Sequence, residues 1–412
     1  MDAREQKALE IAAKSKLTRK GDTWLVPSQA GPKKYTVDPN PQEPHCTCPD
    51  FEARQLRCKH IFAVEYTIQR EQTSDGQTIV TESVRVTQKT YTQDWPAYNK
   101  AQTNEKAHFL AFLYELCSGI DEPVQTFGRP RLPLADIIFS ATFKTYSTVS
   151  GRRFVSDLRD AKAKGYLSKM PSYNSIFDYL KMESLTPYLK HLIAESSLPL
   201  KSIETAFAVD SSGFSTTRFV RWFDVKYGGN EDWHDWIKMH LMCGTSTHIV
   251  TSVELSRARS HDSPYYKPLV DATAKSGFNM QEISADKAYI SEDNLRATVA
   301  HGATPYIPFK SNTSAVSGNK KKDDLWKKLF HFYSFKREEF LMHYHKRSNV
   351  ETTFSMIKAK FGERLRCKTE TAQINEALCK VLCHNLCVVI QSMYELGIDP
   401  TFCTAERLFV QE

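Results

Sequence analysis

Two short runs that each lead into an aspartate constrain the fold of this chain more than any other feature. Residues 206–209 (Ala-Phe-Ala-Val) precede Asp210, and residues 281–285 (Gln-Glu-Ile-Ser-Ala) precede Asp286. Such runs predict short β-strands. A carboxylate beside a buried strand is costly to desolvate unless a metal ion or a charged partner offsets its charge. The pattern therefore predicts a sheet with functional acids at the strand ends.

A third acid, Glu351, lies among cationic and aromatic residues. Arg347 precedes it by four residues, Tyr344 precedes it by seven, and Lys358 follows it by seven. On a regular helix all four side chains would share one face. The simple alternative is an exposed helix in which Arg347 and Glu351 form a weak surface ion pair. The two upstream aspartates favour instead a functional carboxylate held among groups that suit phosphate.

These residues resemble the DDE transposases of bacterial insertion sequences. The third-acid motif of that family, Tyr-x2-Arg-x3-Glu-x6-Lys, is matched at every position by Tyr344, Arg347, Glu351 and Lys358. The turn at 286–289 (Asp-Lys-Ala-Tyr) is similar to the second-acid motif. The resemblance covers about residues 205–368 and implies an RNase H-like domain. Its fold would be a five-stranded mixed α/β sheet with flanking helices, which agrees with the alternation of strand-like and helix-like runs.

The resemblance also implies metal-dependent phosphodiester chemistry. Asp210, Asp286 and Glu351 would be the catalytic acids and would hold two Mg²⁺ or Mn²⁺ ions, with Asp210 bridging both. Arg347 and Lys358 would contact DNA phosphate, and Tyr344 would lie nearby. Four further acids compete with this assignment but are more often helix caps or surface acids. They are Asp224, Glu254, Asp262 and Asp293.

The expected function is a DNA transposase that binds the ends of its mobile element and catalyses cleavage and strand transfer. The expected partners are double-stranded DNA, as terminal repeats and target, and a second copy of the chain in a homodimer. Two alternatives remain open at this stage. One is a domesticated DNA-binding protein that does not cleave, and the other is an RNase H-like nuclease without joining activity.

Composition sets wider bounds. The 412 residues, 41% of them hydrophobic, suffice for two or three domains. Lys and Arg number 55 and Asp and Glu 48, and this net charge of +7 permits nucleic-acid binding without requiring it. No long apolar run or signal peptide is evident, so we expect a cytoplasmic, nucleoid-associated protein without a membrane partner. In that compartment cysteines are reduced thiols or metal ligands.

One cysteine group has the spacing of a metal site. Cys46 and Cys48 are followed after nine residues by Cys58 and His60, and three thiolates with one imidazole suit tetrahedral Zn²⁺. The set resembles a SWIM-type zinc finger, in which the first pair sits on a hairpin and the second pair at a helix start. The alternatives are a chance cluster of buried cysteines and His45 as a substitute ligand. A second group, at 379, 383 and 387, has the period of a helix core.

Changes in composition and in helix or strand pattern along the chain predict five segments. They are a SWIM module (1–70), a linker or hairpin (71–104), a helical, DNA-binding domain (105–198), the catalytic domain (199–368) with a basic insertion (310–343), and a C-terminal helical segment (369–412). The helical domain would be either a helix-turn-helix-like unit or a scaffold with a solvated basic face. Its cations are Arg152, Arg153, Arg159, Lys162, Lys164 and Lys169. The insertion carries lysines that would contact phosphate, at 320–322, 327 and 328.

Overall fold

The structure, a computed structural model, forms two compact units, Met1–Tyr91 and Thr92–Glu412. It describes residues 4, 7–8, 11–12, 15, 17–29, 33–40, 42–72, 94–125, 127–128, 130–216, 236–257, 259–310 and 324–402. Asp224 and the lysines at 320–322 fall outside these residues. The sequence also predicts strands at 78–80, 83–86 and 219–227, which lie outside them, and a helix at 3–15, which lies only partly within them.

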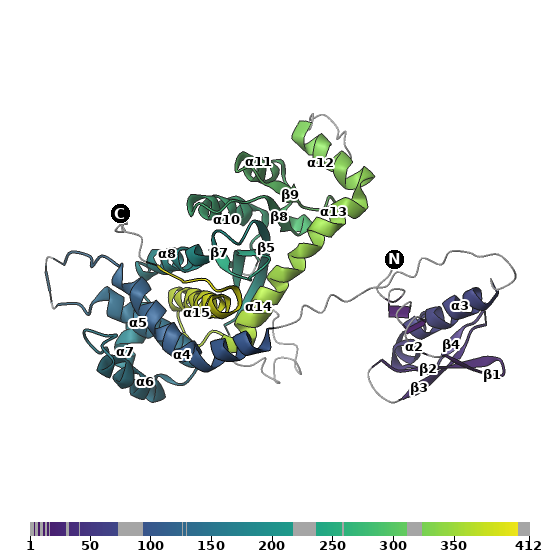
Figure 1. The fold of residues 1–412 in the computed structure, drawn as a ribbon, viewed down its shortest axis with the longest axis horizontal. Coiled ribbons are helices and arrows are strands. Elements are labelled where there is room, and N and C mark those ends of the chain that lie inside the picture. Colours follow the sequence, from purple (N-terminus) through teal and green to yellow (C-terminus); the bar gives the residue numbers. More distant parts are fainter. Residues whose placement is uncertain are drawn as a thin grey trace. The chain divides into compact units, whose positions relative to one another are not determined.

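The described part of the first unit includes an antiparallel sheet followed by helices α2 (Pro49–Arg54) and α3 (Lys59–Gln72) (Figure 1). The strands are β1 (Thr18–Lys20), β2 (Thr23–Pro27), β3 (Lys34–Asp38) and β4 (His45–Cys46), in that spatial order. Alternate strand residues such as Trp24, Val26 and Val37 are buried against Ile61 and Val64 of α3. This period of two is what a sheet with one covered face requires.

The second unit is built around a five-stranded mixed sheet with the spatial order β7-β6-β5-β8-β9 (Figure 1). The strands are β5 (Ala206–Ser215), β6 (Trp236–Gly244), β7 (Val250–Arg257), β8 (Glu282–Ala285) and β9 (Thr304–Tyr306). β5, β6 and β7 pair antiparallel, whereas β5, β8 and β9 pair parallel. The predicted mixed α/β class is thus confirmed.

Helices cover both faces of this sheet. Val209 of β5 packs in a cluster with Tyr266 and Leu269 of α10 (Ser263–Lys275), and α11 (Glu292–Ala300) adds Leu295 to the same cluster. Ala208 belongs to a different cluster, which includes residues of α14 (Ser348–Phe361) and α15 (Glu370–Leu396). Because side chains alternate along a strand, Asp210 points to the same side as Ala208, toward α14.

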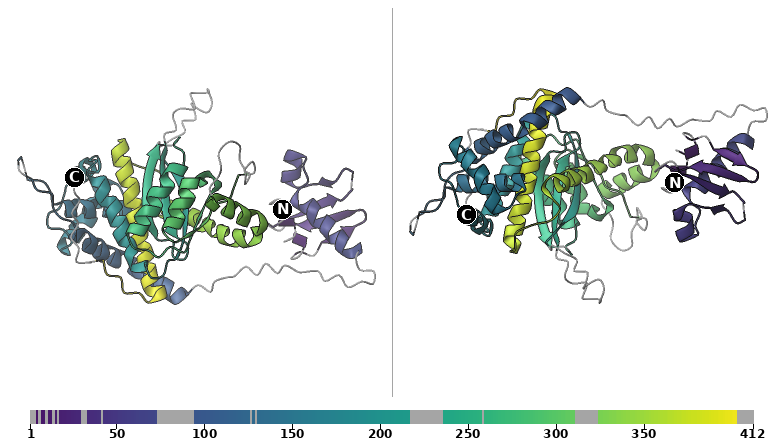
Figure 2. Two further views of the ribbon diagram at one scale, coloured as in Figure 1. Left: turned by 90° about the horizontal axis from the view of Figure 1, so that it is seen from above. Right: turned by 90° about the horizontal axis from the view of Figure 1, so that it is seen from below.

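Helix α15 is the centre of the larger core. It packs against α4 (Trp95–Ser118), α5 (Leu134–Ser147), α8 (Leu185–Ser197) and strand β7. Figure 2 shows it lying between the sheet and these helices. The cysteines at 379, 383 and 387 lie in this core, as predicted. Within the described residues α15 is long and apolar enough to cross a membrane, but 78% of its apolar window is buried inside the unit, as in a core helix.

The helical region also contains α6 (Gly151–Ala163) and α7 (Tyr173–Leu180). Ser172 caps α7, because its side chain accepts a hydrogen bond from the Ser175 amide at 3.1 Å. One predicted boundary differs from the structure. Helix α4 starts at Trp95, inside the expected linker, because Asp94 caps it by accepting from the Ala97 amide at 3.0 Å.

Candidate functional site

The two aspartates lie on neighbouring parallel strands. Asp286 directly follows β8, as predicted, and begins a 3₁₀ turn, η3 (Lys287–Tyr289). Asp210 does not follow its strand; it lies in the middle of β5, which continues to Ser215. The reason is pairing: β8 leaves β5 after the Val209–Ala285 pair, while β6 stays paired through Ser215. The free edge of β5 therefore opens at Asp210, beside Asp286.

The sequence predicted one regular α-helix through the third-acid run, but in the structure this run is divided. Tyr344 ends α13 (Arg337–Tyr344), residues His345–Arg347 form a 3₁₀ turn (η4), and α14 begins at Ser348. A 3₁₀ turn winds the chain more tightly than an α-helix. Glu351 therefore lies in the first turn of α14, and Arg347 and Tyr344 approach the sheet from the preceding turn.

Arg347 bridges two of the three acids. Its Nη1 donates to Asp210 Oδ2 at 2.7 Å, and its Nη2 donates to Glu351 Oε1. The other carboxylate oxygen of Asp210, Oδ1, accepts from the backbone N–H of Ser211 at 2.8 Å. The predicted i,i+4 ion pair between Arg347 and Glu351 is thus present. The same guanidinium uses its other terminal nitrogen to bind Asp210 on the sheet. Asp210 and Glu351 lie close enough to share one cation.

The electrostatics of Asp210 place Asp286 in the same cluster. Burial raises the pKa of Asp210 to about 6, the Ser211 amide and Arg347 lower it, and the charges of Asp286 and Glu351 raise it. The Asp210 side chain is 19% exposed and the Glu351 side chain 57%. Burial alone would favour the neutral acid, so the ionised form at neutral pH depends on cations and donors nearby.

The Tyr344 phenol and the Lys358 amine flank this cluster. Burial raises the pKa of Tyr344, and the nearby charges of Arg347 and Asp286 lower and raise it respectively. Lys358 lies two turns along α14 from Glu351, pairs with Glu363 at 3.2 Å, and stands over the Phe214 ring of β5 at 5.4 Å. The motif residues therefore lie along one path from the acids to the end of β5.

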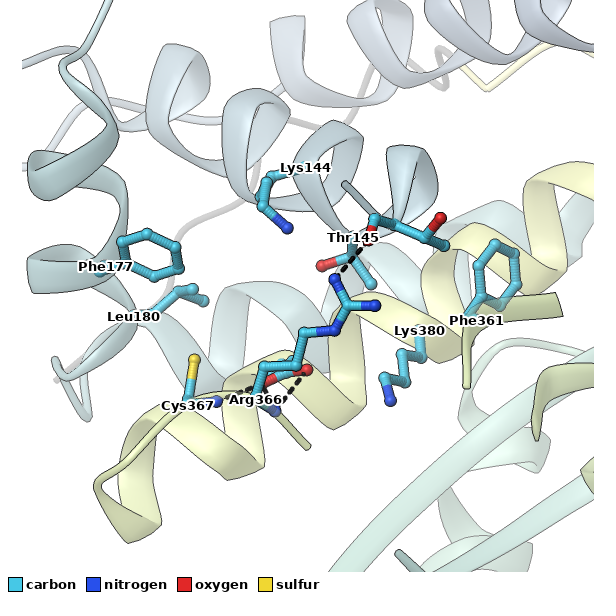
Figure 3. A pocket seen from close by; sticks show the side chains of 10 residues that line it. Lys144, Thr145, Phe177, Leu180, Phe361, Arg366, Cys367 and Lys380 are labelled. Atoms are coloured by element: carbon cyan, nitrogen blue, oxygen red, sulfur yellow. Dashed lines mark hydrogen bonds between the residues drawn. The ribbon is translucent and has the colours of Figure 1, made fainter. Parts of the chain in front are cut away.

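The far end of α14 is anchored beside a small cavity of about 30 Å³ (Figure 3). The Lys380 amine donates to the carbonyl oxygens of Gly362 and Arg364, each at 2.7 Å. Burial lowers the pKa of Lys380 to about 8. The Glu376 carboxylate accepts from the Arg366 and Cys367 amides at 2.8 Å each. These contacts fix the chain after α14, so we interpret the cavity as part of the helix anchor.

The competing acids separate into two kinds. Glu254 pairs with Lys190 at 2.6 Å, and Asp293 pairs with Arg296 on the exposed surface of α11. Both are structural or surface acids, as expected. Asp262 is different: it contacts Ser211 and Lys238 on the sheet. The sequence gives only the His261–Asp262 pair as a signal, and it does not reveal that this acid lies beside the strand of Asp210.

The first unit holds a second cluster. One ligand atom each from Cys46, Cys48, Cys58 and His60 lies within 4.8 Å of the others, and all four residues are buried. His60 Nδ1 is 3.9 Å from the sulfurs of both Cys46 and Cys58. A hydrogen bond from the Cys46 thiol lowers the pKa of Cys58. His45 is exposed, packs on the edge of Phe51 and is not part of the cluster.

The two units together define an α/β protein with acids on neighbouring strands and a separate cysteine–histidine module. Residues 201–386 match the family described as transposase DDE domain, and residues 35–69 match the SWIM zinc finger. No curated protein matches. A solved structure described as a piggyBac transposase synaptic complex with hairpin DNA is similar at 11% identity and a TM-score of 0.36. That match covers 72% of this chain and 78% of the other.

The family assignment rests on the two domain matches, because the structural similarity is low. The chain carries a transposase DDE domain and an N-terminal SWIM zinc finger, and these domains support a DNA transposase function. The enzyme class is therefore that of DNA nucleases and transposases.

Proposed function

We propose that this transposase cleaves and joins DNA at a two-metal centre formed by Asp210, Asp286 and Glu351. The observation that carries the proposal is the Arg347 fork, because a single cationic group already satisfies carboxylates from strand β5 and helix α14. Asp286 directly follows β8, the strand beside Asp210, and its negative charge raises the pKa of Asp210. The strand order β7-β6-β5-β8-β9, with the first three antiparallel, supports an RNase H-like domain.

The donor set fits hard divalent cations, which prefer carboxylate oxygens. Asp210 would hold both Mg²⁺ or Mn²⁺ ions, and Asp286 and Glu351 one each. When bound, two such ions supply activation of the attacking oxygen and stabilisation of the leaving oxygen. The protein positions the carboxylates that would hold these ions. The Ser211 amide fixes one oxygen of Asp210, and α14 presents Glu351 from the open side of the sheet.

Arg347 has two tasks in this proposal. Without metal its guanidinium pairs with both Asp210 and Glu351. Metal ions would replace it there, which leaves its fork available for a phosphate, the other planar partner that a guanidinium binds well. Lys358 supplies a point charge further along α14, and Tyr344 supports Arg347 from the end of α13.

The SWIM module would bind one structural Zn²⁺ through Cys46, Cys48, Cys58 and His60. Three buried thiols and an imidazole within reach of one ion match the ligand set of closed zinc sites. His60 Nδ1 faces the sulfurs, and its ring packs against Tyr35 at 4.8 Å. The buried ligands hold the hairpin and α3 together.

The helical region would hold element-end DNA through a helix-turn-helix. Helices α5 and α6 are joined by three residues, 148–150, with Thr148 in the left-handed region at φ 55°. Helix α6 buries Phe154 and Leu158 and exposes Arg152, Arg153 and Arg159. A short turn followed by a helix with an exposed basic face is the geometry of a recognition helix.

Gly151 at the start of α6 explains how this helix packs. A Cβ there would lie 2.8 Å from Cε2 of Phe177 in α7, so only glycine permits the close approach. Lys162 is not part of the basic face, because its amine donates to the Leu167 carbonyl at 2.8 Å. Lys164 and Lys169 remain exposed and extend the face.

The proposal also includes the remaining expectations from the sequence. The transposase would act as a homodimer, bind target DNA and work in the cytoplasm.

The test uses full-length protein, element-end DNA and Mg²⁺ or Mn²⁺. We expect Glu351→Gln to abolish cleavage, a loss of at least about 10³-fold, while DNA binding is kept. Glu338→Gln, an exposed acid in the first turn of α13, is the matched control and should cut normally. Normal cutting by Glu351→Gln would refute the assignment. Cleavage without strand transfer would support the nuclease alternative, which the domain match does not favour.

A further inference from the structure

Asp262 makes contacts unlike those of a helix cap or surface acid. It directly precedes α10, yet its side chain forms no capping bond there. One carboxylate oxygen instead accepts from the Ser211 hydroxyl at 3.0 Å and pairs with the Lys238 amine at 2.5 Å. His240 Nδ1 lies 3.5 Å from the same oxygen. Asp262 is therefore held over the face of β5 and β6 by groups from both strands.

The partners of Asp262 are themselves fixed. His240 is fully buried, its Nε2 forms a 2.8 Å hydrogen bond with the Ser256 hydroxyl, and its ring stacks on Tyr265 at 4.2 Å. Lys238 also donates to the Ser260 carbonyl at 3.3 Å. A buried polar network in which each member has a partner restricts the positions of all of them. Asp262 is thus a rigid group on the face of the sheet opposite to α14.

Ser211 connects this network to the catalytic acid. Its side chain bonds Asp262 on one face, and its backbone N–H bonds Asp210 Oδ1 at 2.8 Å. Among the residues that the structure describes, β5 has no parallel partner after Val209 until Ser215 meets Arg364, and β6 pairs with it along this stretch. The Ser211–Asp262 bond therefore supports the strand at the point where its ladder becomes one-sided.

Tyr289 lies near this network, in the second-acid turn. It is 1% exposed and ends η3, three residues after Asp286. Burial raises its pKa, and the charges of Asp262 and Asp210 add to the increase.

We propose that Asp262 is a positioning residue of the catalytic centre. Through the Ser211 hydroxyl it fixes the residue whose amide orients the Asp210 carboxylate, and Lys238 offsets its charge. The inference rests on the proposed function, because it takes Asp210 as a metal ligand. Removing an outer hydrogen-bond partner of a metal ligand typically weakens metal binding about 10–100-fold.

The experiment titrates full-length protein with MnCl₂ and follows free Mn²⁺ by electron paramagnetic resonance. We expect Asp262→Asn and Ser211→Ala to raise the Mn²⁺ dissociation constant about tenfold. Ser211→Thr, which keeps the hydroxyl, should restore binding close to that of the unmodified chain. Asp271→Asn is the matched control, because this acid lies on the same helix and pairs with His301 at 2.8 Å. Its Mn²⁺ binding should not change.

Melting temperatures without metal separate positioning from folding. A purely structural role predicts lower melting temperatures with unchanged Mn²⁺ binding, and that result would overturn the proposal, as would normal Mn²⁺ binding by Ser211→Ala. If Asp262→Asn does not fold, the Ser211→Ala and Ser211→Thr pair still decides. Asp210→Asn distinguishes the two levels of inference: if it keeps Mn²⁺ binding, the catalytic metal site itself is wrongly placed.

Discussion

The two ligand clusters of this protein are assembled in opposite ways. The four cysteine and histidine ligands lie within one short segment, are all buried, and have ligand atoms within 4.8 Å of one another. The three acids come from two strands and a helix, and Glu351 lies 351 − 210 = 141 residues after Asp210. The Glu351 side chain is also 57% exposed. One cluster is closed and local, and the other is open and distant in sequence.

This difference leads us to expect different roles for the two bound ions. The cysteine cluster brings three buried thiols and one imidazole together, and thiolates in such a cluster are held in place by the metal ion that they bind. The acidic cluster already has Arg347, which pairs with two of its three carboxylates, so part of its negative charge is offset without a metal ion. We therefore expect metal removal to unfold the first unit but only to inactivate the second.

The largest expected effect is the loss of zinc. Cys58→Ser, or a strong chelator, should unfold residues 1–91, because zinc contributes about 10–16 kcal/mol to small structural sites. The unit at 92–412 should keep its melting transition. Differential scanning calorimetry with zinc analysis measures both units in one sample. A first unit that still melts cooperatively without zinc would remove the contrast.

The next effect concerns pH at the acidic cluster. Protons and metal compete for Asp210, whose pKa is about 6, so the carboxylate is available above that pH and protonated below it. Mn²⁺ affinity should therefore fall as pH decreases through about 6, by about tenfold per pH unit below it. Titrations across this range measure the slope. Constant affinity on both sides of pH 6 would show that Asp210 does not bind the ion.

A smaller effect tests Arg347 as the cation that metal replaces. Arg347→Met should tighten Mn²⁺ binding in the absence of DNA about fivefold, equal to about 1 kcal/mol for a partly exposed ion pair. The same variant should cleave DNA more slowly. Lys346→Met is the control, because Lys346 pairs with Glu282 instead. Unchanged Mn²⁺ binding by Arg347→Met would mean that the fork does not compete with metal.

The smallest effect concerns the basic face of α6. Arg159→Ala should weaken binding of element-end DNA a few-fold and reduce the slope of log K against log salt by about 1. Lys181→Ala is matched to it, because that lysine is exposed but pairs with Asp178 at 2.8 Å. Equal salt slopes for both variants would favour a helical scaffold over a DNA-binding face.

Sequence reasoning succeeded where a signal is local. The cysteine and histidine spacing and the period of four in α15 both reflect neighbours within a few residues. The short runs before Asp210 and Asp286 were also recognised as strands, because a short β-run is visible without knowing its partner. These features depend on local geometry, which the residue pattern determines.

Sequence reasoning failed where pairing between distant segments decides. Asp210 lies inside β5 because β6 extends further than β8, and no local pattern reports the length of a partner strand. Residues 345–347 tighten into a 3₁₀ turn between α13 and α14. Asp262 was judged a cap or surface acid because its contacts, Ser211 and Lys238, lie on strands distant in sequence.

Helix α15 holds the helices and the sheet of the second unit at fixed positions relative to each other. Its buried side chains belong to one continuous core with residues of α4, α5 and α8 and with strands β5, β6 and β7. The helices that carry the basic face and the sheet that carries Asp210 therefore cannot shift against each other without breaking that core. The spacing between a bound DNA sequence and the bond that is cut would then be set by folded protein, so nucleotides inserted between them should move the cut by the same number.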